Sequence, residues 1–306
     1  MRNSKGFIQI PFSWLFAIVI GALILFFAIY ASVRLIKTET TITSEETGKE
    51  ISVLLNPLET GFGEEKTTSL AIPMESKISN SCGIGGNFGQ QQISVSQKIN
   101  GQWADTGIGP IFYNKYIFSN KSVQGKNFFL FSKPFEFPFK VSDLIFFTSA
   151  GDNYCFTNAP ANIEQELSNL NQGNLFTKNC PVGSINVCFS SGNNCNIQVN
   201  KNQKTVNKDG KTVYFETDAL MYGAVFSDPA IYECQVQRLM KRVRELALVY
   251  NDKETIISQK SCPIEVNLLG IANSATSLKD SSDLTNVKAA VDSTSDQNKR
   301  AYCKLW

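Results

Sequence analysis

Residues 6–34, GFIQIPFSWLFAIVIGALILFFAIYASVR, contain no charged side chain before Arg34. At about 1.5 Å per residue, a helix over residues 6–33 is about 42 Å long, which exceeds the roughly 30 Å of hydrocarbon in a bilayer. The apolar core of a cleaved secretory signal is shorter, about 7–15 residues. The stretch therefore predicts a membrane-spanning helix over residues 11–36, preceded by a cytoplasmic tail of residues 1–10.

The orientation of this helix follows from the cysteines rather than from the flanking charges. Arg2 and Lys5 on one side are balanced by Arg34, Lys37 and Lys49 on the other, so the positive-inside rule gives almost a tie. All eight cysteines follow the helix: Cys82, Cys155, Cys180, Cys188, Cys195, Cys234, Cys262 and Cys303. An even set of cysteines favours disulfides in an oxidising compartment. We therefore expect a single-pass protein of the cell membrane, with its N-terminus in the cytoplasm and its C-terminal domain outside.

The small residues of the predicted helix share one face. On a helical wheel they fall within an arc of about 100°, and they are Ser13, Ala17, Gly21, Ala28, Ala31 and Ser32. Small residues let a second membrane helix approach closely. This face predicts packing against another membrane or surface protein, or self-association; chance clustering within an apolar segment is the alternative.

The composition excludes several classes of function. With 29 Lys and Arg against 27 Asp and Glu, the formal net charge is only +2, which argues against a nucleic-acid partner. The chain has no histidine, so Ser-His-Asp and Cys-His catalysis and histidine-ligated metals are ruled out. No two cysteines have the close C-x-x-C spacing of a zinc knuckle. We expect neither a cofactor nor a metal.

The rest of the chain predicts a stalk over residues 37–66 and an α+β domain over 67–306, with a possible internal boundary near 158–180. The domain is expected to be mainly antiparallel sheet with one long packed helix, stapled by disulfides. The strands are expected over residues 69–72, 92–99, 112–118, 127–131, 144–148, 154–157, 184–189 and 196–199. A hairpin at Asp209-Gly210 is expected to join strands over 204–206 and 212–216.

The long helix is predicted to begin at Asp228-Pro229, with the aspartate as N-cap and the proline in the first turn. An apolar stripe follows at spacings of three and four: Tyr232, Val236, Leu239, Val243, Leu246 and Tyr250. Further helices are expected over 161–170 and from Asp283 towards Arg300. The residues Tyr302, Cys303 and Trp306 could then hold the C-terminus against the core.

The aromatic stretch FFLFSKPFEFPFKVSDLIFF, residues 128–147, carries two prolines. It predicts an edge strand, a loop that crosses the core and a central strand. An exposed surface for docking a partner is the alternative.

Three further motifs suggest chemistry, and each has a structural explanation that we prefer. Asp105-Thr106-Gly107 matches the core of the aspartic-protease motif but occurs once, so a turn is favoured. The cluster CGIGGNFG, residues 82–89, lacks the Lys-Ser/Thr of a phosphate loop and is expected to be a bend. A basic run on the long helix is expected to face solvent, with a lipid or partner patch as the alternative: Arg238, Lys241, Arg242 and Arg244.

Disulfide connectivity is open, since eight cysteines allow 105 pairings. One guess is a bond between Cys234, on the long helix, and Cys262, just beyond its end. Asn120-Lys121-Ser122 is a glycosylation sequon, consistent with an outside location.

Two resemblances add to this interpretation. Lys5-Gly6-Phe7, followed by the apolar run, resembles the prepilin signal of type IV pilins, which implies cleavage between Gly6 and Phe7. The segments SKPFEFPFKVSDLIFF, residues 132–147, and ALMYGAVFSDPAIYECQVQRLMKR, residues 219–242, resemble a group of uncharacterised archaeal single-pass membrane proteins. That resemblance implies an archaeal cell surface and no particular activity.

Together these observations predict a membrane-anchored interaction or structural protein of the cell surface, and not an enzyme. A pilin-like filament subunit is one alternative. A membrane-anchored hydrolase that works without histidine, with Asp105 as its best candidate residue, is the other.

Overall fold

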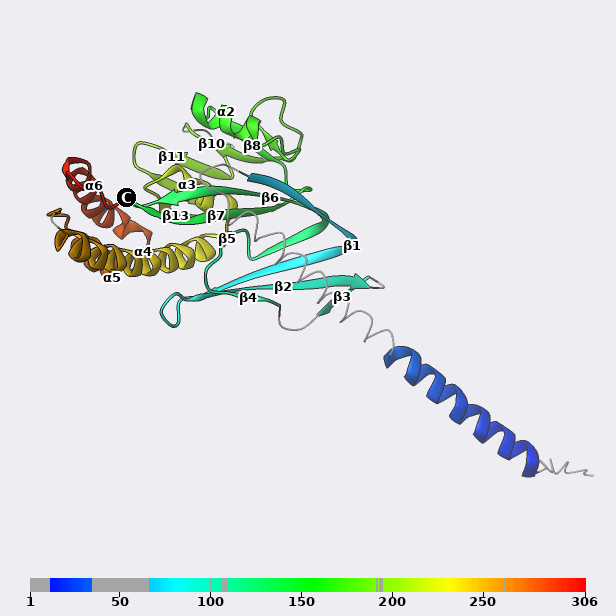
Figure 1. The fold of residues 1–306 in the computed structure, drawn as a ribbon. Coiled ribbons are helices and arrows are strands. Elements are labelled where there is room, and N and C mark those ends of the chain that lie inside the picture. Colours follow the sequence, from blue (N-terminus) through cyan, green and yellow to red (C-terminus); the bar gives the residue numbers. More distant parts are fainter. Residues whose placement is uncertain are drawn as a thin grey trace, which may run out of the picture.

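The computed structural model describes residues 12–34, 66–99, 101–105, 109–190, 192, 195–260 and 262–306. An apolar helix, Phe12–Arg34, is followed by a domain of two mixed sheets and several helices (Figure 1). The helix is long and apolar enough to cross a membrane, and none of it is buried against the domain. The predicted α+β class is confirmed. The predicted tail lies outside the described residues, and so does the predicted stalk except for Lys66, where the first strand begins.

The first sheet is mostly antiparallel. Its strands run in the order β3-β2-β1-β6-β7-β5, with β4 paired to β2. Only β5 and β7 run parallel. The strands are β1 (Lys66–Gly83), β2 (Gln90–Ile99), β3 (Gln102–Asp105), β4 (Ile111–Phe112), β5 (Tyr116–Phe118), β6 (Ser122–Glu136) and β7 (Lys140–Ser149). The predicted strand over 112–118 is thus divided between β4 and β5.

The aromatic stretch lies in the middle of this sheet, so the prediction of an edge strand is wrong. β6 pairs with β1 on one side and with β7 on the other. Among the described residues, pairing with β1 extends as far as Ser132, and Pro134 lies opposite Asp143 of β7. Phe128, Phe131 and Phe135 are buried, which also excludes the exposed docking surface.

Strand β7 is buried on both faces, which explains its nearly continuous apolar sequence. Phe146 belongs to a large core shared with the helices and the second sheet, where its ring lies 4.5 Å from that of Phe131. Phe147 points the other way, into a second core made of residues of the first sheet, and stacks on Phe128.

The second sheet has a parallel centre. Its order is β13-β12-β11-β10-β8-β9, and β8 pairs in parallel with both β9 and β10, while β10 pairs in parallel with β11. β12 and β13 complete it as an antiparallel hairpin. The strands are β8 (Tyr154–Thr157), β9 (Leu175–Phe176), β10 (Ile185–Cys188), β11 (Ile197–Asn200), β12 (Thr205–Lys208) and β13 (Lys211–Tyr214). The expected hairpin turn is confirmed, since Asp209 and Gly210 both have positive φ.

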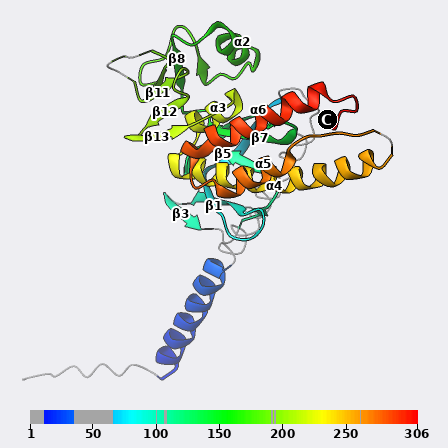
Figure 2. The same ribbon diagram turned by 90° about the vertical axis from the view of Figure 1, so that its left-hand side faces the viewer.

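Helices pack between and beside the sheets (Figures 1 and 2). They are α2 (Ala161–Asn169), α3 (Asp218–Phe226), α4 (Pro229–Ser258), α5 (Leu268–Ser277) and α6 (Leu284–Arg300), with a short 3₁₀ turn at Ser281–Asp283. The predicted start of α4 is confirmed: the Asp228 carboxylate accepts the Ala230 N–H. The stripe from Tyr232 to Val243 is buried, and Leu246 and Tyr250 are half-buried.

Two helices, α3 and α5, escaped prediction. α3 contacts strands of both sheets and is buried on every side, so it shows no amphipathic period. Gly223 on α3 lies so close to the ring of Phe118 that an added Cβ would come within 2.8 Å of it. The C-terminus docks as expected through Trp306, whose ring contacts Tyr250 and Phe139, although Tyr302 is exposed.

Candidate functional site

All eight cysteines are paired, in four disulfides: Cys82–Cys234, Cys155–Cys180, Cys188–Cys195 and Cys262–Cys303. The guessed Cys234–Cys262 bond is wrong. Cys234 lies one turn into α4, which packs on β1, and it is joined there to the end of that strand. Cys262 instead joins the segment after α4 to the C-terminus.

The small residues of the apolar helix are all exposed. A Cβ added at Gly21 would meet nothing within 4 Å, and the Ser32 hydroxyl donates to the Ala28 carbonyl at 2.8 Å. The face thus has room for a close neighbour, and helix packing there stays a prediction. Gly6 and Phe7, the predicted processing site, lie outside the described residues.

The prediction that the basic run on α4 faces solvent is wrong for its first residue, Arg238. Arg238 is fully buried. Its Nη1 donates to the carbonyl of Lys115 at 3.0 Å and to Gln235 Oε1 at 2.8 Å. Its Nη2 donates to the carbonyls of Phe112 and Tyr113, both at 3.1 Å.

Two further contacts of Arg238 show why its position off the apolar stripe did not place it in solvent. Its Nε donates to the Phe88 carbonyl at 3.3 Å, and its guanidinium lies 4.9 Å from the centre of the Tyr116 ring. The long side chain carries the charge off the apolar stripe into a cage of backbone carbonyls between α4 and the first sheet. Arg244, by contrast, is exposed and pairs with Glu245.

The glycine-rich loop of residues 82–89 presents carbonyl oxygens to cations. Lys241 Nζ donates to the carbonyls of Ile84 and Gly86, next to the bond from Arg238 to Phe88. A phosphate loop would have to present N–H groups to an anion instead. The expected bend is present between β1 and β2. Its role as a docking point for α4 was not predicted from the sequence.

A second buried cation, Lys208, ties the second sheet to the helices. Its Nζ donates to Asn120 Oδ1 at 3.0 Å and to the carbonyls of Val225 and Ser227 at 3.2 and 2.9 Å. Desolvation lowers the pKa of Lys208 to about 8 despite the nearby carboxylates of Asp209, Asp228 and Asp152. Because Asn120 of the sequon is half-buried and holds this lysine, its side chain has a structural task.

The other candidate residues form no catalytic group among the residues that the structure places. Asp105 ends β3, while Thr106 and Gly107 lie outside the described residues. Within the described chain, no group of three or more acidic or cysteine side chains could hold a metal ion.

The structure contains a crevice that sequence reasoning missed, at the carboxyl ends of the parallel strands. β8 is followed by α2 and then β9 on one side, whereas β10 pairs on the other side of β8. Ligands of open parallel sheets bind outside the carboxyl ends of the strands, at such a reversal of strand order. The crevice has a volume of about 590 Å³ and is lined by Asn158, Pro160, Phe189, Ser190, Gly192, Gln198, Val199, Asn200, Lys201 and Asn202.

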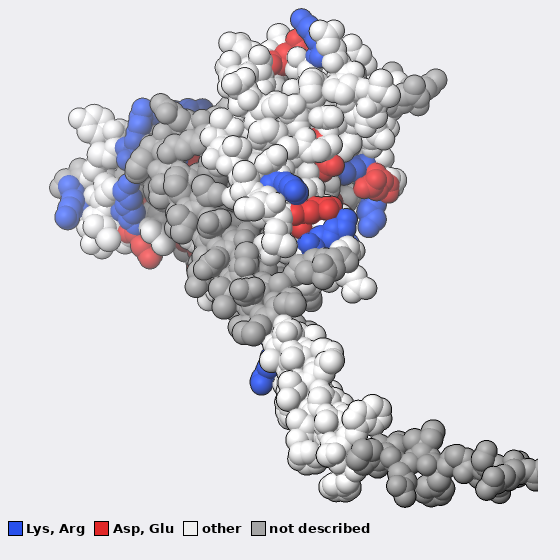
Figure 3. Space-filling view, turned by 90° about the vertical axis from the view of Figure 1, so that its right-hand side faces the viewer, with Lys and Arg blue, Asp and Glu red and all other residues white. Residues whose placement is uncertain are grey.

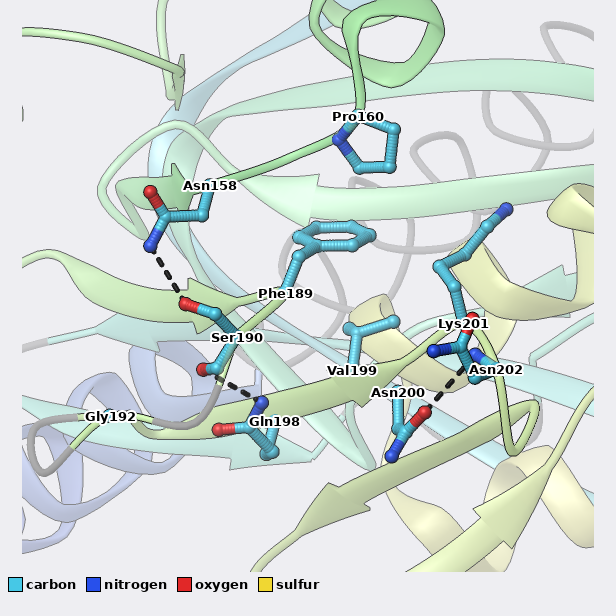
Figure 4. Close-up of a pocket in the computed structure, with 10 residues that line it drawn as sticks. All are labelled: Asn158, Pro160, Phe189, Ser190, Gly192, Gln198, Val199, Asn200, Lys201 and Asn202. Carbon is cyan, nitrogen blue, oxygen red and sulfur yellow. Dashed lines mark hydrogen bonds between the residues drawn. The ribbon is translucent and has the colours of Figure 1, made fainter.

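The crevice has an apolar middle and polar ends (Figure 4). The half-buried ring of Phe189 faces Pro160, which directly precedes α2, and Val199 lies beside the ring. Asn158 lies towards one end and Lys201 towards the other. None of the described lining residues is a carboxylate, and Lys201 is ion-paired with Asp218 of α3, so this part of the lining is close to neutral.

Two amides that point away from Pro160 hold the polar ends in place. Gln198 Nε2 donates to the carbonyls of Cys188 and Ser190 at 3.2 and 3.0 Å. Asn200 Oδ1 accepts the N–H of Asn202 at 3.1 Å. The Cys188–Cys195 disulfide closes the loop that carries Ser190. These bonds hold the described rim residues Ser190 and Asn202 against β11.

Comparison of the chain with protein-family models, with curated proteins and with solved structures gives no significant match.

Proposed function

We propose that this chain is a single-pass membrane protein whose disulfide-stapled domain lies outside the cell membrane and acts by binding, as part of a membrane or surface assembly. The observation that carries the proposal is the complete pairing of eight cysteines in a domain that follows an apolar helix. Structural disulfides persist in oxidising compartments and are rare in the cytosol.

The apolar helix supports the anchoring part of the proposal. Its surface is uncharged up to Arg34, and the space-filling view shows no acidic or basic atoms along it before that end (Figure 3). A helix left unburied by its own domain must cover its apolar side chains with lipid or with another helix.

Binding is favoured over catalysis by the character of the polar groups. The buried cations Arg238 and Lys208 donate to carbonyls and amides and so hold elements of the fold together. The crevice at the second sheet is near neutral and has amide and hydroxyl groups suited to recognition.

Protease treatment of intact cells tests the orientation. If the domain lies outside, external protease releases it or its fragments from intact cells, while a cytoplasmic marker protein stays intact. Protection of the domain in intact cells, with digestion only after lysis, would show the reverse orientation and refute the proposal.

The assembly part is tested by gentle extraction. We expect the full chain to co-purify with other membrane or surface proteins, or with further copies of itself. A monodisperse monomer without partners from native membranes would contradict it. The pilin-like signal makes a separate prediction: an intact N-terminus running through Gly6 in mature protein would exclude processing between Gly6 and Phe7.

A further inference from the structure

We infer that the crevice between β8, β10 and β11 binds a neutral, polyhydroxylated ligand, the sugar unit of a glycan, on the platform formed by Phe189 and Pro160. The inference deepens the proposed function, on which it rests for the extracytoplasmic location, by naming the ligand class. Its basis is the position of the crevice, the shape of its middle and the hydrogen-bonding capacity of its rim.

The crevice has the position and the size of a small-molecule site. The crevice lies at the reversal of strand order around β8, where the carboxyl ends of parallel strands leave a gap between the loops that follow them. Its volume of about 590 Å³ falls within the range of about 300–1,000 Å³ typical of small-molecule sites.

The second step is the apolar platform. A sugar ring has one face lined by C–H groups, which carry slight positive charge, and an aromatic face is slightly negative. The ring of Phe189 is half-buried and lines the crevice together with Pro160, so it offers an apolar surface to that face of a sugar (Figure 4).

The third step is the rim, which has free donors and acceptors but little net charge. Asn158 Nδ2 donates to Ser190 Oγ at 2.8 Å, so its Oδ1 is left as an acceptor and the Ser190 hydrogen as a donor. The Asn202 side-chain amide has no hydrogen bond within the described chain. Hydroxyl groups, which both donate and accept, complement such a mixed set.

The charge of the lining separates this ligand from an anion. A phosphate or carboxylate site needs uncompensated positive charge, and Lys201, the one cation among the described lining residues, is already paired with Asp218. A cationic ligand is disfavoured too, since none of the described lining residues is a carboxylate.

The test uses the full chain in lipid nanodiscs free of glycolipid and of glycosidic detergent, because a sugar headgroup would compete. The probes are N,N′-diacetylchitobiose and maltose as neutral sugars, with glucuronic acid and inorganic phosphate as anions, each up to about 10 mM, where Kd values in the millimolar range are detectable. Saturation-transfer NMR and titration calorimetry measure binding. A disaccharide linked to a carrier protein distinguishes a surface glycan, which would bind more tightly in that form, from a free sugar.

The variants separate contact from folding. Phe189→Ala is expected to weaken neutral-sugar binding by about tenfold or more, the loss of roughly 1.4 kcal/mol. Phe176→Ala is the matched control, since Phe176 is a half-buried phenylalanine of the same sheet outside the crevice. Asn202→Ala, at an exposed position, is expected to weaken binding severalfold without disturbing the fold.

Asn158→Asp adds a negative charge in nearly the same shape. Loss of the amide donor to Ser190 should weaken neutral-sugar binding severalfold, whereas binding of an anion would fall by a much larger factor because of repulsion. The inference is overturned if no neutral sugar binds to protein with intact disulfides, if only the anions bind, or if Phe189→Ala and Phe176→Ala weaken binding equally. Failure of the proposed function is a different result, namely a domain located in the cytoplasm.

Discussion

Replacement of Arg238 by methionine should destabilise the domain more than any substitution of the other basic residues on α4. Methionine retains the apolar stem but removes every guanidinium bond. Three buried acceptors then lose the Arg238 donor: the carbonyls of Phe112 and Lys115 and the side-chain oxygen of Gln235. The part-buried carbonyl of Tyr113 loses it too.

The magnitude follows from two opposing effects. Each buried acceptor left without a partner costs about 1–3 kcal/mol, although such costs do not add fully. The variant also removes the desolvation cost of a buried charge, and no carboxylate is left unpaired, because the cage of Arg238 consists of neutral groups. The lost acceptor bonds, less the relieved desolvation, leave an expected net loss of about 3–5 kcal/mol, a large part of the roughly 5–15 kcal/mol that stabilises a typical domain.

The assay is guanidinium unfolding of the full chain with its disulfides intact, followed by far-ultraviolet circular dichroism. Arg244→Met is the matched control on the same helix, since Arg244 is exposed and pairs only with its neighbour Glu245. Its expected cost is within about 0.5 kcal/mol. A cost below about 1 kcal/mol for Arg238→Met, or equal costs for the two variants, would refute the interpretation of Arg238 as the central link between α4 and the first sheet.

Three further predictions concern other parts of the chain. Burial lowers the pKa of Lys208 to about 8 in the folded domain, against an ordinary value of 10.5. Between these two values the unfolded chain binds more protons than the folded one, so the free energy of unfolding should rise from about pH 8 to 10. Lys208→Met should flatten this rise, as measured by the unfolding midpoint. Gly21→Ile should disrupt helix association measured by crosslinking in membranes, whereas Ala22→Ile, on the opposite side of the helix, should not; equal effects would exclude the small-residue face. Because a longer closed loop restricts the unfolded chain more, replacing Cys262 and Cys303, 41 residues apart, by serine should cost about 4 kcal/mol of stability. The same replacement of Cys188 and Cys195, 7 residues apart, should cost about 2.5 kcal/mol. The reverse order in unfolding experiments would contradict this dependence on loop length.

Local signals in the sequence predicted the elements whose structure depends on local chemistry. The Asp228-Pro229 start and apolar stripe of α4 were confirmed, as was the Asp209-Gly210 hairpin, because a cap, a helical period and a two-residue turn each act over a few residues. The apolar helix Phe12–Arg34 was clear for the same reason.

The predictions that were wrong or missing concern residues whose environment is set by partners distant in the chain. Arg238 and its partner Phe112 lie far apart in sequence, and only the packing of α4 on the first sheet buries the guanidinium among carbonyls. α3 was missed because a helix buried on all sides has no polar face to reveal its period.

The crevice was missed for a related reason. Its walls come from the ends of β8, β10 and β11, and no short motif indicates that these strands would pair in parallel. In hindsight the sequence does carry a signal. Small polar residues stand at or just after the ends of the three short strands: Asn158, Ser190, Asn200 and Asn202.

Alkylation of the protein in native membranes, followed by mass spectrometry without reduction, tests the central claim most directly. A disulfide-stapled domain outside the membrane should show no alkylated cysteine and four linked peptide pairs: Cys82 with Cys234, Cys155 with Cys180, Cys188 with Cys195, and Cys262 with Cys303. Eight alkylated thiols in protein taken from its own membrane would place the domain in a reducing compartment and contradict the account.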